Sequence, residues 1–217
     1  IVVVRHLFMT IGLLAIGYVM NRGRGLGLAS AFSMPGFVAC ISYGIGSITF
    51  IIALKHTTVA QTLLIITALP VTTAIMARIF LNESVRPSAW FAMAGSLVGI
   101  AVMSGSIFQG GSLYGFMMAV ATVATMTYFA LGLRWGRSGN MMPSIAMGSL
   151  VAAFVAALIS PSSPFDVSTH DLIVLMSWGA VMSAAMITLF VVAARSVPGG
   201  EMMLFIAVEA ALGPLWV

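Results

Sequence analysis

The segment FIIALKHTTVAQTLLII, residues 50–66, decides the fold class of this chain. It joins the end of one apolar run, 34–54, to the start of another, 58–81, through a short polar turn. Each run has about the 20 residues that an α-helix needs to cross the hydrocarbon core of a bilayer. The segment therefore predicts a hairpin of two membrane-spanning helices.

The composition of the whole chain agrees with a membrane protein. Of its 217 residues, 61% are hydrophobic and 6% are charged, whereas a soluble domain has about 25% charged residues. The mean hydropathy is +1.14. These values exclude the soluble globular, disordered and collagen-like classes. The single cysteine, Cys40, excludes a disulfide framework and a CxxC metal or redox site.

Apolar runs of spanning length recur along the chain. They lack the period-2 alternation of a barrel strand, so they predict helices. Pro35, Pro87 and Pro143 fall in first turns, where a missing N–H costs nothing. The predicted fold class is an all-α integral membrane protein with about eight transmembrane helices. The runs are 3–20, 34–54, 58–81, 88–108, 112–133, 142–160, 171–194 and 201–217.

Both ends of the chain cut into apolar runs. The first residue is Ile1 rather than Met, and the run that starts near Glu201 reaches Val217 without a polar exit. A basic region that would begin a signal peptide does not precede the first run. We therefore expect a fragment of a longer protein.

The basic residues predict the orientation in the membrane, because positive residues favour the cytoplasmic side. Connections between helices alternate sides, and one alternating set holds seven basic residues against two, Arg5 and Lys55, in the other. We expect the richer set to be cytoplasmic. It comprises Arg22, Arg24, Arg78, Arg86, Arg134, Arg137 and Arg195. Nearly all of these arginines are interpreted as topology anchors.

An internal repeat appears when the chain is shifted by 140 residues. A basic residue and a Gln or Glu then occupy equivalent positions in two connections between helices. By the charge count these two connections lie on opposite sides of the membrane. Similar units of opposite orientation are the signature of an inverted repeat. The matched pairs are Phe50–Phe190, Ala53–Ala193, Lys55–Arg195, Gln61–Glu201, Leu64–Leu204 and Ile66–Ile206.

The chain resembles the EamA-type repeats of the drug/metabolite transporter superfamily. The resemblance lies in ALKHTTVAQTLL (53–64), LPV (69–71), LNE (81–83) and GSLVGI (95–100), and again in AARSVPGGEMM (193–203) and EAALGPLW (209–216). It implies a ten-helix plan of two inverted five-helix repeats, of which this chain covers helices 2–9. Residues 1–108 would form the first repeat and 111–217 the second. It also implies a secondary transporter of a small metabolite, amino-acid-like or drug-like, in the cell (inner) membrane.

Several residues inside the spans are candidates for substrate binding. Glu209 is a carboxylate near mid-span, where charge is costly and normally faces a cavity or a partner; a structural hydrogen bond is the alternative. Pro70 breaks its helix, as Pro214 does in the related one, and Thr67 lies beside Pro70. A packing kink and back-bonding to the helix are the alternatives there. Tyr128 and Trp178 lie within spans and could stack on a substrate.

Other functional classes find weaker support. The motif Gly136-Arg137-Ser138-Gly139 matches the GxSG of intramembrane serine proteases, but it lies in a predicted loop away from all three histidines. A channel would show a filter-like carbonyl loop or a ring of charged residues, and neither is visible in the sequence. We expect no enzyme activity, cofactor, metal site or nucleic-acid partner. The expected partners are a small-molecule substrate and the lipid bilayer, and Gly95 with Gly99 leaves a homodimer open.

Overall fold

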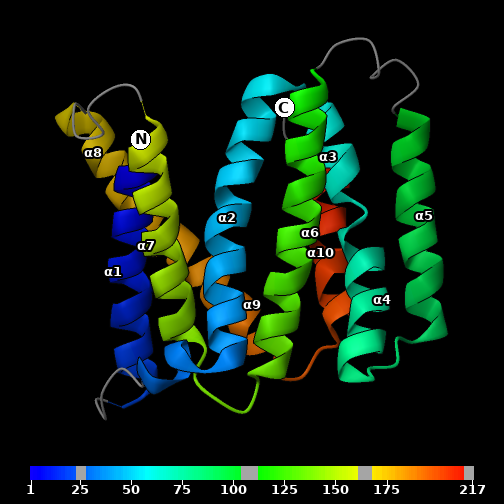
Figure 1. The fold of residues 1–217 in the computed structure, drawn as a ribbon, viewed down its shortest axis with the longest axis horizontal. Coiled ribbons are helices and arrows are strands. Elements are labelled where there is room, and N and C mark those ends of the chain that lie inside the picture. Colours follow the sequence, from blue (N-terminus) through cyan, green and yellow to red (C-terminus); the bar gives the residue numbers. More distant parts are fainter. Residues whose placement is uncertain (23–27, 104–111, 161–167, 213–217) are drawn as a thin grey trace.

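The structure is a computed structural model that describes residues 1–22, 28–103, 112–160 and 168–212, without the side chains of 96, 99–103 and 207–212. Its regular elements are helices, which run alternately up and down (Figure 1). They are α1 (Val2–Met20), η1 (Leu28–Phe32), α2 (Met34–His56), α3 (Val59–Ile66), α4 (Leu69–Leu81), α5 (Pro87–Met103), α6 (Leu113–Trp135), α7 (Met142–Ile159), α8 (Thr169–Met176), η3 (Ser177–Ser183), α9 (Ala184–Ala193) and α10 (Gly199–Leu212).

These helices make the chain a multi-pass membrane protein of the all-α class. Six described segments are long and apolar enough to cross a bilayer, namely Val2–Met20, Met34–His56, Val59–Leu81, Leu113–Trp135, Met142–Ile159 and Thr169–Ala193. The remaining two predicted spans coincide with α5 and α10, whose described parts have 17 and 14 residues. The predicted fold class is confirmed.

Local sequence explains where several helices begin. The side chains of Ser33, Thr58, Ser112 and Ser168 accept hydrogen bonds from backbone N–H groups of the first turns of α2, α3, α6 and α8. These caps satisfy donors that have no partner within the helix. Proline also occupies the first turns of α2, α5 and α7, as predicted.

Two of the spans depart from a regular α-helix. The span 59–81 is interrupted at Thr67 and Ala68, so Pro70 lies at the beginning of α4 rather than inside one helix. The span 169–193 contains the π-helical segment η3 between α8 and α9. The first break agrees with the position of Pro70, which lacks an N–H donor. The π-helical segment was not predicted; such segments are rare and occur frequently at functional sites.

The helices pack into two groups on either side of α2 and α6. On one side α1 contacts α7, η3 and α9, and on the other α4 contacts α10 and α10 contacts α5 (Figure 1). The main buried cluster includes Met9, Phe129, Ile145 and Met203, so it draws on both halves of the chain. The pairing of α1 with α7 and of α4 with α10 brings distant segments of the sequence together.

Glycines allow one close crossing. A β-carbon at Gly179 in η3 would lie 2.5 Å from the backbone oxygen of Arg5, and one at Gly12 would collide with the backbone of Ala180. The backbones of α1 and η3 therefore touch directly. By contrast, a β-carbon at Gly95 would have no heavy atom of the described residues within 4 Å. Gly95 thus packs against none of the described helices, and the environment of Gly99 lies outside the described side chains.

Candidate functional site

A cavity of about 640 Å³ lies between the two groups of helices. Its walls come from both halves of the chain, with residues of α1, α2, α3 and α4 facing residues of α6, α8, η3 and α10. The lining residues include Arg5, Tyr43, Ser47, Phe50, Ile51, Ile66, Leu69, Thr122, Met126, Val174, Leu175, Trp178 and Ile206. A volume of this size is typical of sites for small molecules.

The cavity reaches from one end of the bundle to its middle. In Figure 1 the upper end of the bundle holds the start of α1 and the end of α2, and the lining residues Arg5 and Ile51 belong to these parts of the two helices. Leu69 is the first residue of α4, and Ile206 lies in the middle of α10. Most lining side chains are apolar, and Arg5 is the charged member among those described. The walls can therefore hold an apolar body, with polar contacts restricted to a few positions.

Aromatic rings pack together next to the cavity. Tyr43 lines the cavity, and its ring centroid lies 5.3 Å from that of Phe129 in α6. Phe129 in turn stacks on Phe190 of α9 with centroids 6.0 Å apart. The Tyr43 hydroxyl donates to the sulfur of Met9, 3.3 Å away. These contacts join α1, α2, α6 and α9 beside the cavity.

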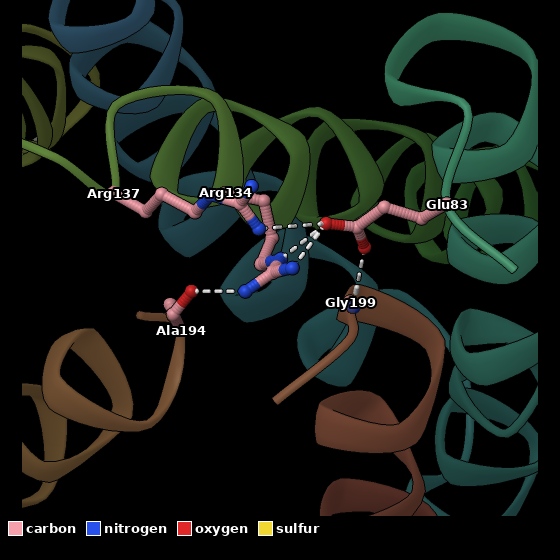
Figure 2. A network of polar contacts seen from close by, with 5 residues as sticks. All are labelled: Glu83, Arg134, Arg137, Ala194 and Gly199. Atoms are coloured by element: carbon pink, nitrogen blue, oxygen red, sulfur yellow. Dashed lines mark hydrogen bonds and ion pairs between the residues drawn. The ribbon is translucent and has the colours of Figure 1, made fainter. Parts of the chain in front are cut away.

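A polar network joins the end of α6 to the connections that follow α4 and α9 (Figure 2). These segments lie at the opposite end of the bundle from the start of α1 (Figure 1). Arg134 Nε donates to Glu83 Oε1 at 2.7 Å, and Arg134 Nη2 donates to the same oxygen. Arg134 Nη1 donates to the backbone oxygen of Ala194 at 2.7 Å, and Gly199 N donates to Glu83 Oε2 at 3.3 Å. Arg137 makes a longer ion pair of 3.7 Å with Glu83.

The network places each charge at a favourable helix end. The Glu83 side chain contacts the first residue of α10, and the Arg134 side chain contacts the residue that follows α9. The negative charge thus lies at the positive end of one helix dipole and the positive charge at the negative end of the other. Asn82 ends α4 in the left-handed conformation, φ 52°, which Asn tolerates better than most residues. This turn directs Glu83 toward α6. The Arg134 and Glu83 side chains are 5% and 14% exposed, so the pair is largely buried.

The sequence-based candidates lie at different places relative to the cavity. Trp178 lines it, and its side chain is 59% exposed. Thr67 is fully buried, donates to the backbone oxygen of Leu64 at 2.6 Å, and is not among the lining residues. Pro70 is buried next to the lining residue Leu69. Tyr128 is 45% exposed on α6, away from the described lining.

The acidic candidates lie in α10. The backbone of Glu209 belongs to this helix, but its side chain lies outside the described part of the structure, as does Pro214. Its role in substrate binding therefore stays a prediction. Glu201 lies in the first turn of α10, as expected for a carboxylate that complements the helix dipole.

Sequence reasoning missed the cavity role of Arg5 and Tyr43 and the pairing of Arg134 with Glu83. The distribution of basic residues predicts a topology anchor at Arg134, and Glu83 belongs to the LNE segment, residues 81–83, of the family resemblance. The scarcity of acidic residues was the signal available: five in 217 residues, one of them following the end of an apolar run.

Other site types find no support among the described residues. No group of three or more His, Cys, Asp or Glu side chains there could hold a metal ion. Ser138 of the GxSG match lies in the turn between α6 and α7, and its side chain is exposed. The three histidines lie near helix ends on the opposite side of the bundle from Ser138, namely His6, His56 and His170.

Comparisons with known proteins agree with a transporter. Residues 1–105 match the model of the EamA-like transporter family. A solved structure, described as "Crystal structure of protein", aligns with 99% of this chain and 87% of its own length, with a TM-score of 0.63 and 16% identity. At this identity the likeness concerns the fold. No curated protein matches the sequence significantly. The match over residues 1–105, together with the apolar helices, supports an EamA-type member of the drug/metabolite transporter superfamily, a superfamily of membrane transporters.

Proposed function

We propose that the protein is a secondary transporter that moves a small metabolite, amino-acid-like or drug-like, across the cell (inner) membrane by alternating access. The observation that carries this proposal is the cavity of about 640 Å³, whose walls come from both halves of the chain. A site between two halves can change the side from which it is reached when one half rocks against the other.

The arrangement of the two ends supports alternating access. The cavity is lined by residues from the start of α1 and the end of α2, whereas the Tyr43–Phe129–Phe190 rings and the Glu83–Arg134 pair lie toward the opposite ends of these and the neighbouring helices. In this proposal the end with the Glu83–Arg134 pair is closed, and the distribution of basic residues makes it the cytoplasmic end. In this proposal the structure is an outward-facing state, and the Glu83–Arg134 pair acts as a latch that opens when the cavity turns inward.

The inverted-repeat organisation, with units 1–108 and 111–217, is part of the proposal. Adding 140 to Val59, the first residue of α3, gives 199, the first residue of α10. The span 59–81, which is related to α10 by this shift, packs against α10 mainly through its second part, α4. Ile66 and Ile206, matched by the same shift, both line the cavity. Such pairing is the arrangement expected of two halves related by an axis in the membrane plane.

Glu209 and Trp178 are the proposed substrate contacts with the clearest chemistry. Glu209 follows Ile206 by three positions in α10, and positions three apart lie on the same side of a helix. A carboxylate there would suit a substrate that carries an amino group. The ring of Trp178 would stack on an apolar part of the substrate.

The test is counterflow in proteoliposomes without ATP. Vesicles loaded with unlabelled L-phenylalanine, as the first probe of an amino-acid panel, should transiently accumulate the labelled form above equilibrium. A channel would equilibrate the label without overshoot, and an enzyme would convert it. Lack of overshoot with every probe of the panel, in vesicles that contain folded protein, would contradict the carrier proposal.

A further inference from the structure

Arg5 gives the cavity a positively charged wall. It is the charged side chain among the described lining residues, and the remaining walls are mostly apolar. We propose that Arg5 anchors the carboxylate of a substrate whose apolar body fills the rest of the cavity. This inference rests on the proposed transport function and assigns a substrate class to that cavity.

The hydrogen bonding of Arg5 leaves its charge available. Arg5 Nη2 donates to His6 Nε2 at 3.3 Å, and no salt bridge joins Arg5 to an acidic side chain in the described part of the chain. His6 Nδ1 lies 2.9 Å from the backbone oxygen of Val2, which can only accept. His6 is therefore the Nδ1–H tautomer, with Nε2 free to accept from Arg5. A neutral partner orients the guanidinium without neutralising it.

The backbone around Arg5 is fixed on two sides. A β-carbon added at Gly179 would lie 2.5 Å from the backbone oxygen of Arg5. The backbones of α1 and η3 are therefore in direct contact at this point. The backbone oxygen of His6 accepts hydrogen bonds from Thr10 Oγ1 and from Ser149 Oγ of α7, each at 2.9 Å. A guanidinium on such a support keeps its position when the cavity is filled, which lowers the entropic cost of binding.

The π-helical segment brings a ring to the same wall. Trp178 precedes Gly179, so the contact between η3 and α1 also positions Trp178 beside the turn that carries Arg5. A planar guanidinium with parallel N–H donors recognises a carboxylate through two hydrogen bonds. The juxtaposition of this cation with Trp178 suits a carboxylate that is attached to an aromatic or branched apolar group.

The experiment compares three probes of nearly the same shape and different charge: 3-phenylpropanoate, its amide, and 3-phenylpropylamine. Binding to the purified protein in lipid nanodiscs is measured by isothermal titration. The wild type should bind the acid about tenfold or more tightly than the amide, because a hydrogen bond to a charged group contributes about 1.5–3 kcal/mol. The amine lacks the carboxylate and should bind more weakly than the acid.

Three variants separate the role of Arg5 from general effects of charge. Arg5→Gln should abolish the preference for the acid while leaving the affinity for the amide within about twofold. Arg5→Lys should retain part of the preference, and its melting temperature reports whether position 5 tolerates substitution. Lys55→Gln is the matched control, because Lys55 is an exposed basic residue near the same end of the bundle and is not among the described lining residues. It should change no affinity.

The outcomes distinguish this inference from the transport proposal. Equal affinities of acid and amide in the wild type, or an acid preference that survives Arg5→Gln, would overturn the role of Arg5. A preference for the amine over the acid would also overturn it and would assign the charge selectivity to an acidic group. Counterflow of amino acids in the same preparation would then still support the transporter. Failure of all three probes together with absent counterflow would contradict both.

Discussion

Arg134, the penultimate residue of α6, holds Glu83, two residues beyond the end of α4, through two donors to one carboxylate oxygen. The pair also ties in the backbones of Ala194 and Gly199, on either side of the α9–α10 connection (Figure 2). Three connections of the bundle therefore meet at one buried ion pair. This explains why an arginine that could serve as a surface anchor is only 5% exposed.

Removal of either partner should destabilise this end of the bundle. Glu83→Gln and Arg134→Gln each break a buried pair, for which the expected loss is about 3–5 kcal/mol. The double variant should lose less stability than the sum of the two single variants, because it leaves no unpaired charge from this pair. Thermal unfolding in detergent, arranged as a double-mutant cycle, measures this coupling.

Arg137→Gln is the matched control for this cycle. The Arg137 side chain is 55% exposed and lies 3.7 Å from Glu83, so its loss should cost no more than about 1 kcal/mol. Strict additivity of the Glu83 and Arg134 substitutions would mean that the two residues do not act as a pair.

Trp178→Ala should weaken binding with little effect on folding. Loss of an aromatic contact worth about 0.5–1.5 kcal/mol corresponds to an affinity about two- to tenfold weaker for 3-phenylpropanoate. The exposed ring contributes little to the core, so the melting temperature should change little. Tyr128→Ala, which removes a similar ring away from the described cavity lining, should leave affinity unchanged. A larger effect at Tyr128 than at Trp178 would place the substrate elsewhere.

Gly179→Ala should destabilise the contact between α1 and η3. The added β-carbon would lie 2.5 Å from the backbone oxygen of Arg5, which cannot move without moving the helix. The expected loss is about 1–3 kcal/mol, as for other overpacked sites. Gly95→Ala is the control, since open space surrounds that position among the described residues, and alanine is the better helix former. Equal stability of the two variants, measured by thermal unfolding, would argue against the direct contact.

Glu209→Gln tests the carboxylate that the sequence places in α10. The substitution keeps shape and hydrogen bonding but removes the charge. In the proposed role, counterflow of a substrate with an amino group should fall, while expression and transport of an amide without that group stay near normal. Unchanged counterflow of both would make Glu209 a packing residue.

The helices could be predicted because a bilayer requires long apolar segments, and runs such as 34–54 and 142–160 meet that requirement without reference to the rest of the chain. The long-range contacts between helices could not be predicted in this way. Glu83 and Arg134 are separated by 51 residues, and the anchoring role of arginine explains Arg134 equally well. The π-helical turn at Trp178 leaves no periodic signal in an almost wholly apolar segment. For the same reason, residues that face lipid and residues that face the cavity, such as Ile51 and Ile66, cannot be told apart by hydrophobicity.

Accessibility of the cavity from each side of the membrane tests the central claim most directly. Ser47→Cys, in a Cys40→Ser background, places a single thiol on the cavity wall, and Ser138→Cys in the same background marks the predicted cytoplasmic end. An impermeant maleimide added outside intact cells should label Ser47→Cys and spare Ser138→Cys. Inside-out vesicles should show the reverse, and adding Arg134→Gln should raise labelling of Ser47→Cys from the cytoplasmic side. Labelling of Ser138→Cys from outside, or of Ser47→Cys only from the cytoplasmic side with the Glu83–Arg134 pair intact, would contradict the account.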